Sequence, residues 1–277
     1  MYRRPSCFPL TEVLVCASLL SAPVPCFSND SIAGWDGRTV RFERSEKIRV
    51  EQEVLYVSPA SIIVNYVFFN TDSKTLHAKI AFPMPGPDRD DPGPEIQMKL
   101  FVNGREISGV WVGDATLEPR LPTGWRARTL LWECDFPARE AVKVRHELTG
   151  ATGADQEIWV YGGDRFKEYC VDEIRFSPEI EKEFKDCGFH WSSYVRYLLT
   201  PAANWAGPIK HFELIIEKLS PDSFVSTCFE GLKKISPTKF KVAIDDFTPT
   251  EDLSVIWFHR WSRENLEYCH EQSQSPQ

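Results

Sequence analysis

The sequence has little positive charge and no long hydrophobic segment. Its 277 residues contain 32 Lys and Arg against 40 Asp and Glu, so the formal net charge is −8. A chain of this charge is repelled by a phosphate backbone, which argues against nucleic-acid binding. Apolar residues make up 42% of the chain and charged residues 26%, as in ordinary globular proteins, so a fibre or a multi-span membrane protein is excluded.

The common catalytic motifs are also missing. The sequence contains no G-x-S-x-G, no Walker loop and no EF-hand loop. His146-Glu147 and His270-Glu271 begin like a zinc-protease motif but lack its second histidine. The carboxylates of residues 86–95 (GPDRDDPGPE) match no calcium-ligand spacing, which favours a solvated loop. Most histidines alternate with apolar strand positions, so we expect them to face solvent, and we expect no metal and no cofactor.

The first thirty residues have the pattern of an export signal. Arg3 and Arg4 precede an apolar run at residues 13–22, and small residues follow as far as Ser28. This order is typical of a secretory signal peptide, with cleavage near Ser28 and Asn29 as the new N-terminus. The run spans only about half of a ~30 Å hydrocarbon layer. We therefore expect a periplasmic or secreted protein without a transmembrane span; the alternative is that this segment forms a buried strand.

Cleavage would leave five cysteines, which cannot all pair within one chain. No two have the C-x-x-C spacing of redox or zinc sites, so structural disulfides are favoured in an oxidising compartment. We expect the cysteine in the polar C-terminal tail, Cys269, to be the unpaired one. The five are Cys134, Cys170, Cys187, Cys228 and Cys269.

Alternating apolar and polar residues predict β-strands over much of the chain. Residues 62–69 are apolar at most positions, which predicts a strand buried on both faces. Residues 76–82 and 142–148 alternate, as half-buried strands do. Asn103-Gly104 tolerates positive φ at both turn positions and predicts a tight hairpin. Frequent strands joined by turn residues make an antiparallel sandwich the expected architecture.

A short helix interrupts the strands. Ser177 can cap it, Pro178 suits its first position and Gly188 can end it. The fold class expected is mainly β, with two antiparallel β-sandwich-like units and a short helical segment between them. The predicted divisions are a signal peptide (1–28), an N-terminal β domain (29–165), a helix plus C-terminal β domain (166–260) and a polar tail (261–277).

One connection between predicted strands is a candidate binding site. It contains Asn204, Trp205 and Gly207, followed by Pro208. A large aromatic side chain beside Gly and Pro can form an exposed stacking platform for a sugar or a peptide. The alternative is that Trp205 packs over the end of the sandwich and fills its core, with Asn204 bonding its own turn. Because tryptophan is more often buried than exposed, we favour this alternative.

A group of carboxylates provides a second candidate site. Asp245, Asp246 and Glu251 flank a Thr-Pro turn, and two carboxylates about 5–10 Å apart in a cleft could hydrolyse a glycosidic bond. Turns before strands also collect aspartate for local hydrogen bonding, which is the simpler interpretation.

Several segments of the chain resemble a known family. They are Asn29-Asp30-Ser31, VNYVFFNTDSKTLHAKIAFPMP at 64–85, YCVDE at 169–173 and YLLTPAANWAGPIKHFELIIEK at 197–218. Together they resemble the bacterial extracytoplasmic family called domain of unknown function number 4424. The resemblance implies a secreted or periplasmic protein with no established activity, and it supplies no catalytic residues.

The resemblance also bears on the cysteines. Cys170 and Cys228 lie in matching segments, whereas Cys134 and Cys187 do not, so the resemblance implies a Cys170–Cys228 disulfide. The rival pairing is Cys170–Cys187, across the predicted helix.

These observations favour a non-catalytic binding or envelope-accessory module. Its partner would be a glycan or peptide ligand, or another envelope protein that adds a strand to an exposed sheet edge. The alternative is an extracytoplasmic hydrolase of glycan or peptide that uses the carboxylates described above. Fold alone supports no catalytic chemistry, so we favour binding.

Overall fold

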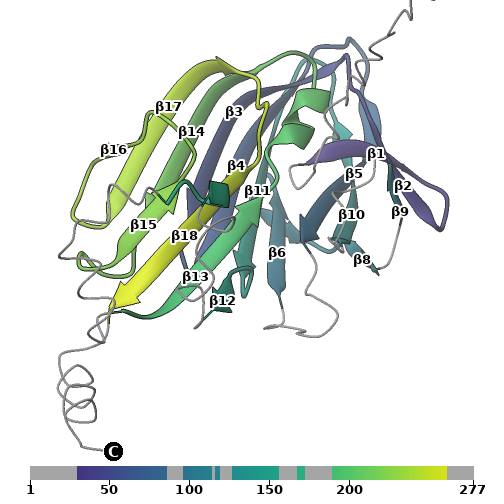
Figure 1. Ribbon diagram of the computed structural model, residues 1–277. Coiled ribbons are helices and arrows are strands. Elements are labelled where there is room, and N and C mark those ends of the chain that lie inside the picture. Colours follow the sequence, from purple (N-terminus) through teal and green to yellow (C-terminus); the bar gives the residue numbers. More distant parts are fainter. Residues whose placement is uncertain are drawn as a thin grey trace, which may run out of the picture.

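Figure 1 shows the computed structural model, which describes residues 30–85, 96–113, 116–118, 127–155, 167–171 and 189–260. The predicted signal peptide, the acidic loop 86–95, the predicted helix 177–188 and the polar tail 261–277 lie outside these residues, as do Cys187 and Cys269. Within the described part, no helix is long and apolar enough to cross a membrane.

The fold is mainly β, as predicted, and its described strands form three sheets with antiparallel pairing between almost all neighbours. The six-stranded sheet has the order β8 (Val110–Gly113), β10 (Ala127–Phe136), β5 (Leu76–Pro85), β1 (Ser31–Trp35), β2 (Thr39–Glu43) and β9 (Thr116–Glu118). The eight-stranded sheet has the order β16 (Lys233–Lys234), β17 (Lys239–Phe247), β14 (Ile209–Glu217), β3 (Ile48–Val57), β4 (Ser61–Asn70), β11 (Ala141–Thr149), β6 (Gln97–Val102) and β7 (Arg105–Ile107). The four-stranded sheet has the order β12 (Gly153–Asp155), β13 (Phe189–Tyr197), β18 (Leu253–Arg260) and β15 (Phe224–Thr227).

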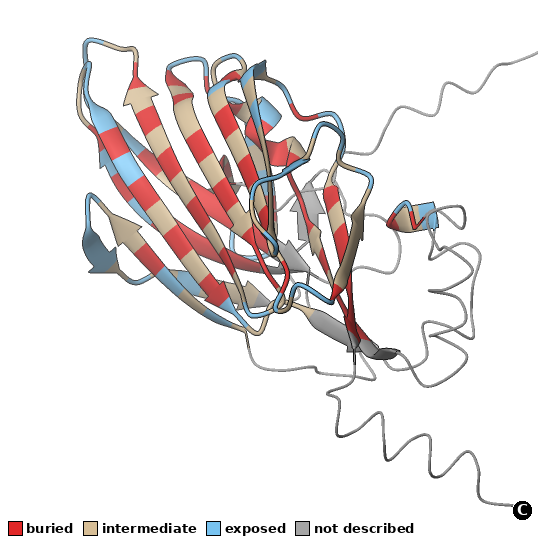
Figure 2. Ribbon diagram, turned by 90° about the vertical axis from the view of Figure 1, so that its left-hand side faces the viewer, coloured by how far each residue is buried: buried red, intermediate tan, exposed pale blue. Residues whose placement is uncertain are grey.

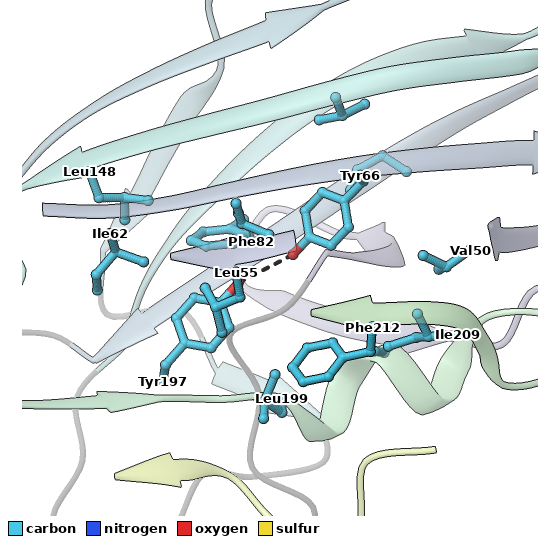
Figure 3. Close-up of a cluster of buried hydrophobic side chains, with 14 of the residues drawn as sticks. Val50, Leu55, Ile62, Tyr66, Phe82, Leu148, Tyr197, Leu199, Ile209 and Phe212 are labelled. Atoms are coloured by element: carbon cyan, nitrogen blue, oxygen red, sulfur yellow. Dashed lines mark hydrogen bonds between the residues drawn. The ribbon is translucent and has the colours of Figure 1, made fainter. Parts of the chain in front are cut away.

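The two predicted groups of strands share the eight-stranded sheet. β14, from the second group, pairs in parallel with β3, from the first, and places Phe212 opposite Glu53. The main hydrophobic core draws side chains from all three sheets, among them Phe82 of β5, Leu55 of β3 and Trp257 of β18. Figure 3 shows part of this core, where residues of β3, β4, β5, β11 and β14 meet. Strands on both sides of the boundary predicted at residue 165 therefore belong to one sheet and contribute to one core.

The predicted hairpin at Asn103-Gly104 is confirmed. It joins β6 to β7, and the two residues have φ values of 49° and 80°. Asparagine and glycine are the residues that adopt positive φ most readily, so the turn forms at little steric cost.

The prediction that residues 62–69 are buried on both faces is wrong. In β4 the even-numbered residues, such as Tyr66 and Phe68, are buried, while Ile63, Val67 and Phe69 are only partly covered. The same alternation runs through β3, β11 and β14 (Figure 2). One face of the eight-stranded sheet packs on the core, and we call the opposite, partly solvated face the outer face.

Candidate functional site

The candidate connection Asn204-Trp205-Gly207 is held in place by an aspartate from another strand end. It follows a short 3₁₀ helix, η1 (Thr200–Asn204), which lies between β13 and β14. Asp252 Oδ1 accepts hydrogen bonds from the backbone N–H groups of Leu199 (3.0 Å) and Thr200 (3.1 Å), and from the Thr200 hydroxyl (2.9 Å). Asp252 thus satisfies the free N–H groups at the start of η1, as a capping side chain does.

Trp205 is buried and does not form a stacking platform. Its side chain is 1% exposed, its ring centroid lies 4.7 Å from that of Phe68, and its indole N–H donates to the backbone oxygen of Asp30 (2.7 Å). This is the alternative arrangement, in which Trp205 fills the core. A ligand has no aromatic face to stack on here, because both faces of the ring are covered.

Asn204 and Gly207 also have structural contacts or conformations. Asn204 was expected to bond its own turn, but its Nδ2 donates to Ser31 Oγ (3.1 Å), and its backbone oxygen accepts from Ser45 N–H (2.7 Å). Gly207 is exposed and has φ of 85°, a conformation that suits glycine at the entry to β14. Asn204 and Trp205 therefore bind the start of β1, and Gly207 provides the backbone conformation that leads into β14.

Asp30, which Trp205 binds, belongs to a group of buried polar side chains that sequence reasoning missed. Asp30 and His146 are both fully buried, and Asp30 Oδ2 lies 2.9 Å from His146 Nε2. The indole N–H of Trp132 donates to Asp30 Oδ1 (3.3 Å). The expectation that most histidines face solvent does not hold for His146: it lies on the same face of β11 as Val144 and Leu148, and this face packs on the core.

Tyr66, Tyr197 and Glu53 extend the buried group. The two tyrosine hydroxyls lie 3.2 Å apart (Figure 3), and Glu53 is fully buried on β3. Burial raises the pKa of Tyr66 and of Tyr197 well above the usual value, and the nearby carboxylates of Glu53 and Asp30 add to this rise. We call these five residues, Asp30, Glu53, Tyr66, His146 and Tyr197, the buried polar cluster.

The buried polar cluster is closed to solvent, so it is placed to hold the sheets together rather than to meet a substrate. Asp30 joins the start of β1 to β10 through Trp132 and to β11 through His146. Buried polar groups are costly without partners, so these contacts favour the observed arrangement of the strands.

The outer face carries a hollow of about 500 Å³ over β3, β4, β11 and β6. Strand register places Arg145 of β11 directly between Asn65 of β4 and Phe101 of β6. Lys143 and Glu147 flank Arg145 on the same strand face, and both line the hollow. Charged, amide and aromatic side chains thus converge on one partly solvated site, which sequence reasoning missed because it expected β4 to be covered on both faces.

The carboxylates proposed for hydrolysis do not converge. Asp245 is 81% exposed and lies 2.8 Å from His211, and Asp246 is 65% exposed and pairs with Lys210 at 2.6 Å. Glu251 is also exposed. Each aspartate pairs with a different side chain at the surface, so these residues form no paired carboxylate site in a cleft.

The predicted disulfide is confirmed. Cys170 and Cys228 are linked, at a sequence separation of 58. Cys134 is a free, buried thiol, and burial raises its pKa to about 11, so it is a poor nucleophile. Among the residues that the structure describes, no group of three or more His, Cys, Asp or Glu side chains could hold a metal ion.

Comparison with known proteins gives a family and a fold. The model of a family described as "Domain of unknown function (DUF4424)" matches residues 28–109 and 106–256. No curated protein sequence matches the chain. A crystal structure from Legionella pneumophila, provisionally described as a nutrient binding protein, has a TM-score of 0.54 and 16% identity. The match covers 83% of this chain and 73% of that one, so the two share a fold.

Two M1 zinc metallopeptidase structures are more distant. One is a two-domain E323A mutant bound to L-tryptophan, with a TM-score of 0.32, and the other is from Deinococcus radiodurans, with a TM-score of 0.33. Both are 12% identical over 78% of this chain, and the match covers 44% and 43% of their lengths.

Proposed function

We propose that this chain, which belongs to the family described as "Domain of unknown function (DUF4424)", is an exported, non-catalytic binding protein whose ligand site is the hollow on the outer face. The single observation that carries the proposal is the placement of Arg145, between Asn65 and Phe101, on a sheet face that is open to solvent. Concave sites that combine an aromatic residue with a few oriented polar groups are typical of small-molecule recognition.

The remaining chemistry of the protein supports binding over catalysis. The carboxylates at positions 245 and 246 are exposed and separately paired, and Asp30 and Glu53 are sealed in the core. The buried thiol of Cys134 is held protonated by its raised pKa. The description of the Legionella structure as a nutrient binding protein agrees with a ligand-binding role.

Export is supported by the disulfide and by the leader-like first segment. Disulfides persist in oxidising compartments and are rare in the cytosol. The Cys170–Cys228 link is therefore the bond expected of a protein that folds after export.

Cell fractionation tests export. The full chain expressed in a bacterial host should yield a processed polypeptide that begins near Asn29, in the extracytoplasmic fraction, with Cys170 and Cys228 linked. A Leu19→Arg control, which places a charge in the apolar run, should abolish processing. Full-length polypeptide in the cytosol with both thiols free would contradict export.

A ligand screen tests the site. Sugars, amino acids and short peptides, both neutral and charged, would be assayed for an increase in the thermal midpoint of the purified protein. We expect at least one ligand to bind, and Phe101→Ser to weaken it about tenfold or more while the unliganded midpoint changes little, since Phe101 is partly exposed. Ligands that bind Phe101→Ser and the wild type equally would place the site elsewhere.

A further inference from the structure

The guanidinium group of Arg145 is oriented by its neighbours. Its Nε donates to Glu147 Oε1 (2.7 Å) and its Nη1 donates to Asn65 Oδ1 (2.9 Å). Nη2 makes no hydrogen bond to any described residue, and the side chain is 41% exposed. Nε and Nη1 fix the orientation of the guanidinium plane, and Nη2 is left to bind an anion. Because the side chain is already ordered, little side-chain entropy is lost on binding.

The charge of the hollow matches a single negative charge. Lys143, Arg145 and Glu147 alternate along the outer face of β11, and their formal charges sum to +1. Lys143 is exposed and forms no ion pair with any other described residue. This local excess is opposite in sign to the net charge of the chain, which is −8.

The rest of the hollow suits an organic body rather than a bare ion. Phe101 lies directly opposite Arg145, and Val67 lies directly opposite Lys143, so each cation has an apolar neighbour. Gln52 and Asn65 add amide groups at the β3–β4 side. An apolar or ring-shaped body could pack against Phe101 while the amides bond its polar substituents.

We propose that the hollow binds a small organic monocarboxylate, with the carboxylate held by Arg145 and Lys143 and the body of the molecule against Phe101. A monocarboxylate neutralises the local charge of +1, whereas a phosphate dianion would leave it negative. Arg145 forms the directional hydrogen bonds and Lys143 acts as a point charge. This inference rests on the proposed binding function and adds the chemical class of the ligand.

Matched acids and amides test the inference. Phenylacetate and glucuronate would be titrated against phenylacetamide and glucuronamide by calorimetry at low ionic strength, because each pair differs only in the charged group. We expect at least one acid to bind about tenfold or more tightly than its amide, as hydrogen bonds to charged groups imply. Added salt should weaken the acid and leave the amide unchanged.

Variants assign that difference to the site. Arg145→Gln should remove the preference for the acid, and Lys143→Gln should reduce it; if Arg145→Gln fails to fold, Lys143→Gln and Arg145→Lys provide the test. The control is Lys241→Gln, on the same sheet face at β17, where Lys241 is paired with Glu213 at 2.7 Å. This control should keep the wild-type affinity.

The outcomes separate this inference from the proposed function. Equal binding of acid and amide, no binding of either acid, or an acid preference that survives in Arg145→Gln would each overturn the inference. The binding function itself would still stand if a neutral ligand from the screen bound the wild type and lost affinity in Phe101→Ser. It would fail only if that screen also found no ligand at the hollow.

Discussion

Truncation of Trp205 should show whether this residue holds the fold or meets a ligand. The indole is 1% exposed and packs at 4.7 Å from Phe68, so Trp205→Ala leaves a large cavity in the core. Such substitutions cost about 3–5 kcal/mol. The backbone oxygen of Asp30 also loses its 2.7 Å donor, which adds about 1 kcal/mol. Because net stabilities are about 5–15 kcal/mol, this total loss of about 4–6 kcal/mol should remove about a quarter or more of the free energy of unfolding.

Two further variants divide this loss into its parts. Trp205→Phe keeps a ring against Phe68 but loses the N–H donor, so about 2 kcal/mol should be lost. Asn204→Ala, a control on the neighbouring residue, removes only the hydrogen bond to Ser31 and should cost about 1 kcal/mol. Urea unfolding followed by far-ultraviolet circular dichroism measures all three, since it does not depend on tryptophan fluorescence. A loss below about 1 kcal/mol in Trp205→Ala, combined with lost ligand binding, would refute the argument and restore the stacking platform.

Three other changes have defined outcomes. Burial lowers the pKa of His259 from 6.5 to about 4. The neutral imidazole therefore stabilises the fold fully above pH 6.5. About 3 kcal/mol of the free energy of unfolding should be lost as the pH falls from 6.5 through 4. Urea midpoints from pH 4 to 7 should show this slope in the wild type but not in His259→Gln. Replacing Cys170 and Cys228 together by Ala should lower the unfolding free energy by about 4 kcal/mol, because a loop closed at a sequence separation of 58 is released; an unchanged midpoint would contradict this. Asp252→Ala should cost about 2 kcal/mol in the same assay, with Asp252→Asn losing less, since three hydrogen bonds at the start of η1 lose their acceptor.

Local patterns predicted the local structure well. The alternation of residues 142–148 corresponds to β11, and Asn103-Gly104 forms the β6–β7 turn, because side-chain period and turn conformation are determined by neighbouring residues. The disulfide came from the family resemblance, and no spacing rule could have selected Cys228 over Cys187 as the partner of Cys170.

The pairing of strands that are far apart in the sequence could not be predicted from local patterns. The parallel contact of β14 with β3 joins residues more than 150 positions apart, and nothing in either strand specifies its neighbour. For the same reason, the sequence of residues 62–69 shows that both faces of the strand are apolar. It does not show whether other parts of the chain cover the outer face. In the structure, Val67 and Ile63 are only partly buried.

His146 shows how a polar residue on an apolar strand face should be interpreted. The alternation of residues 142–148 puts it on the same strand face as Val144 and Leu148, whereas its polarity favours an exposed position. A buried imidazole needs a partner, and here the partner is Asp30, which also binds Trp132 and Trp205 from 102 and 175 residues away. A single sequence displays the residue types but not this convergence. When side-chain period and polarity disagree, the period gives the direction, and the polarity indicates that a buried partner must exist.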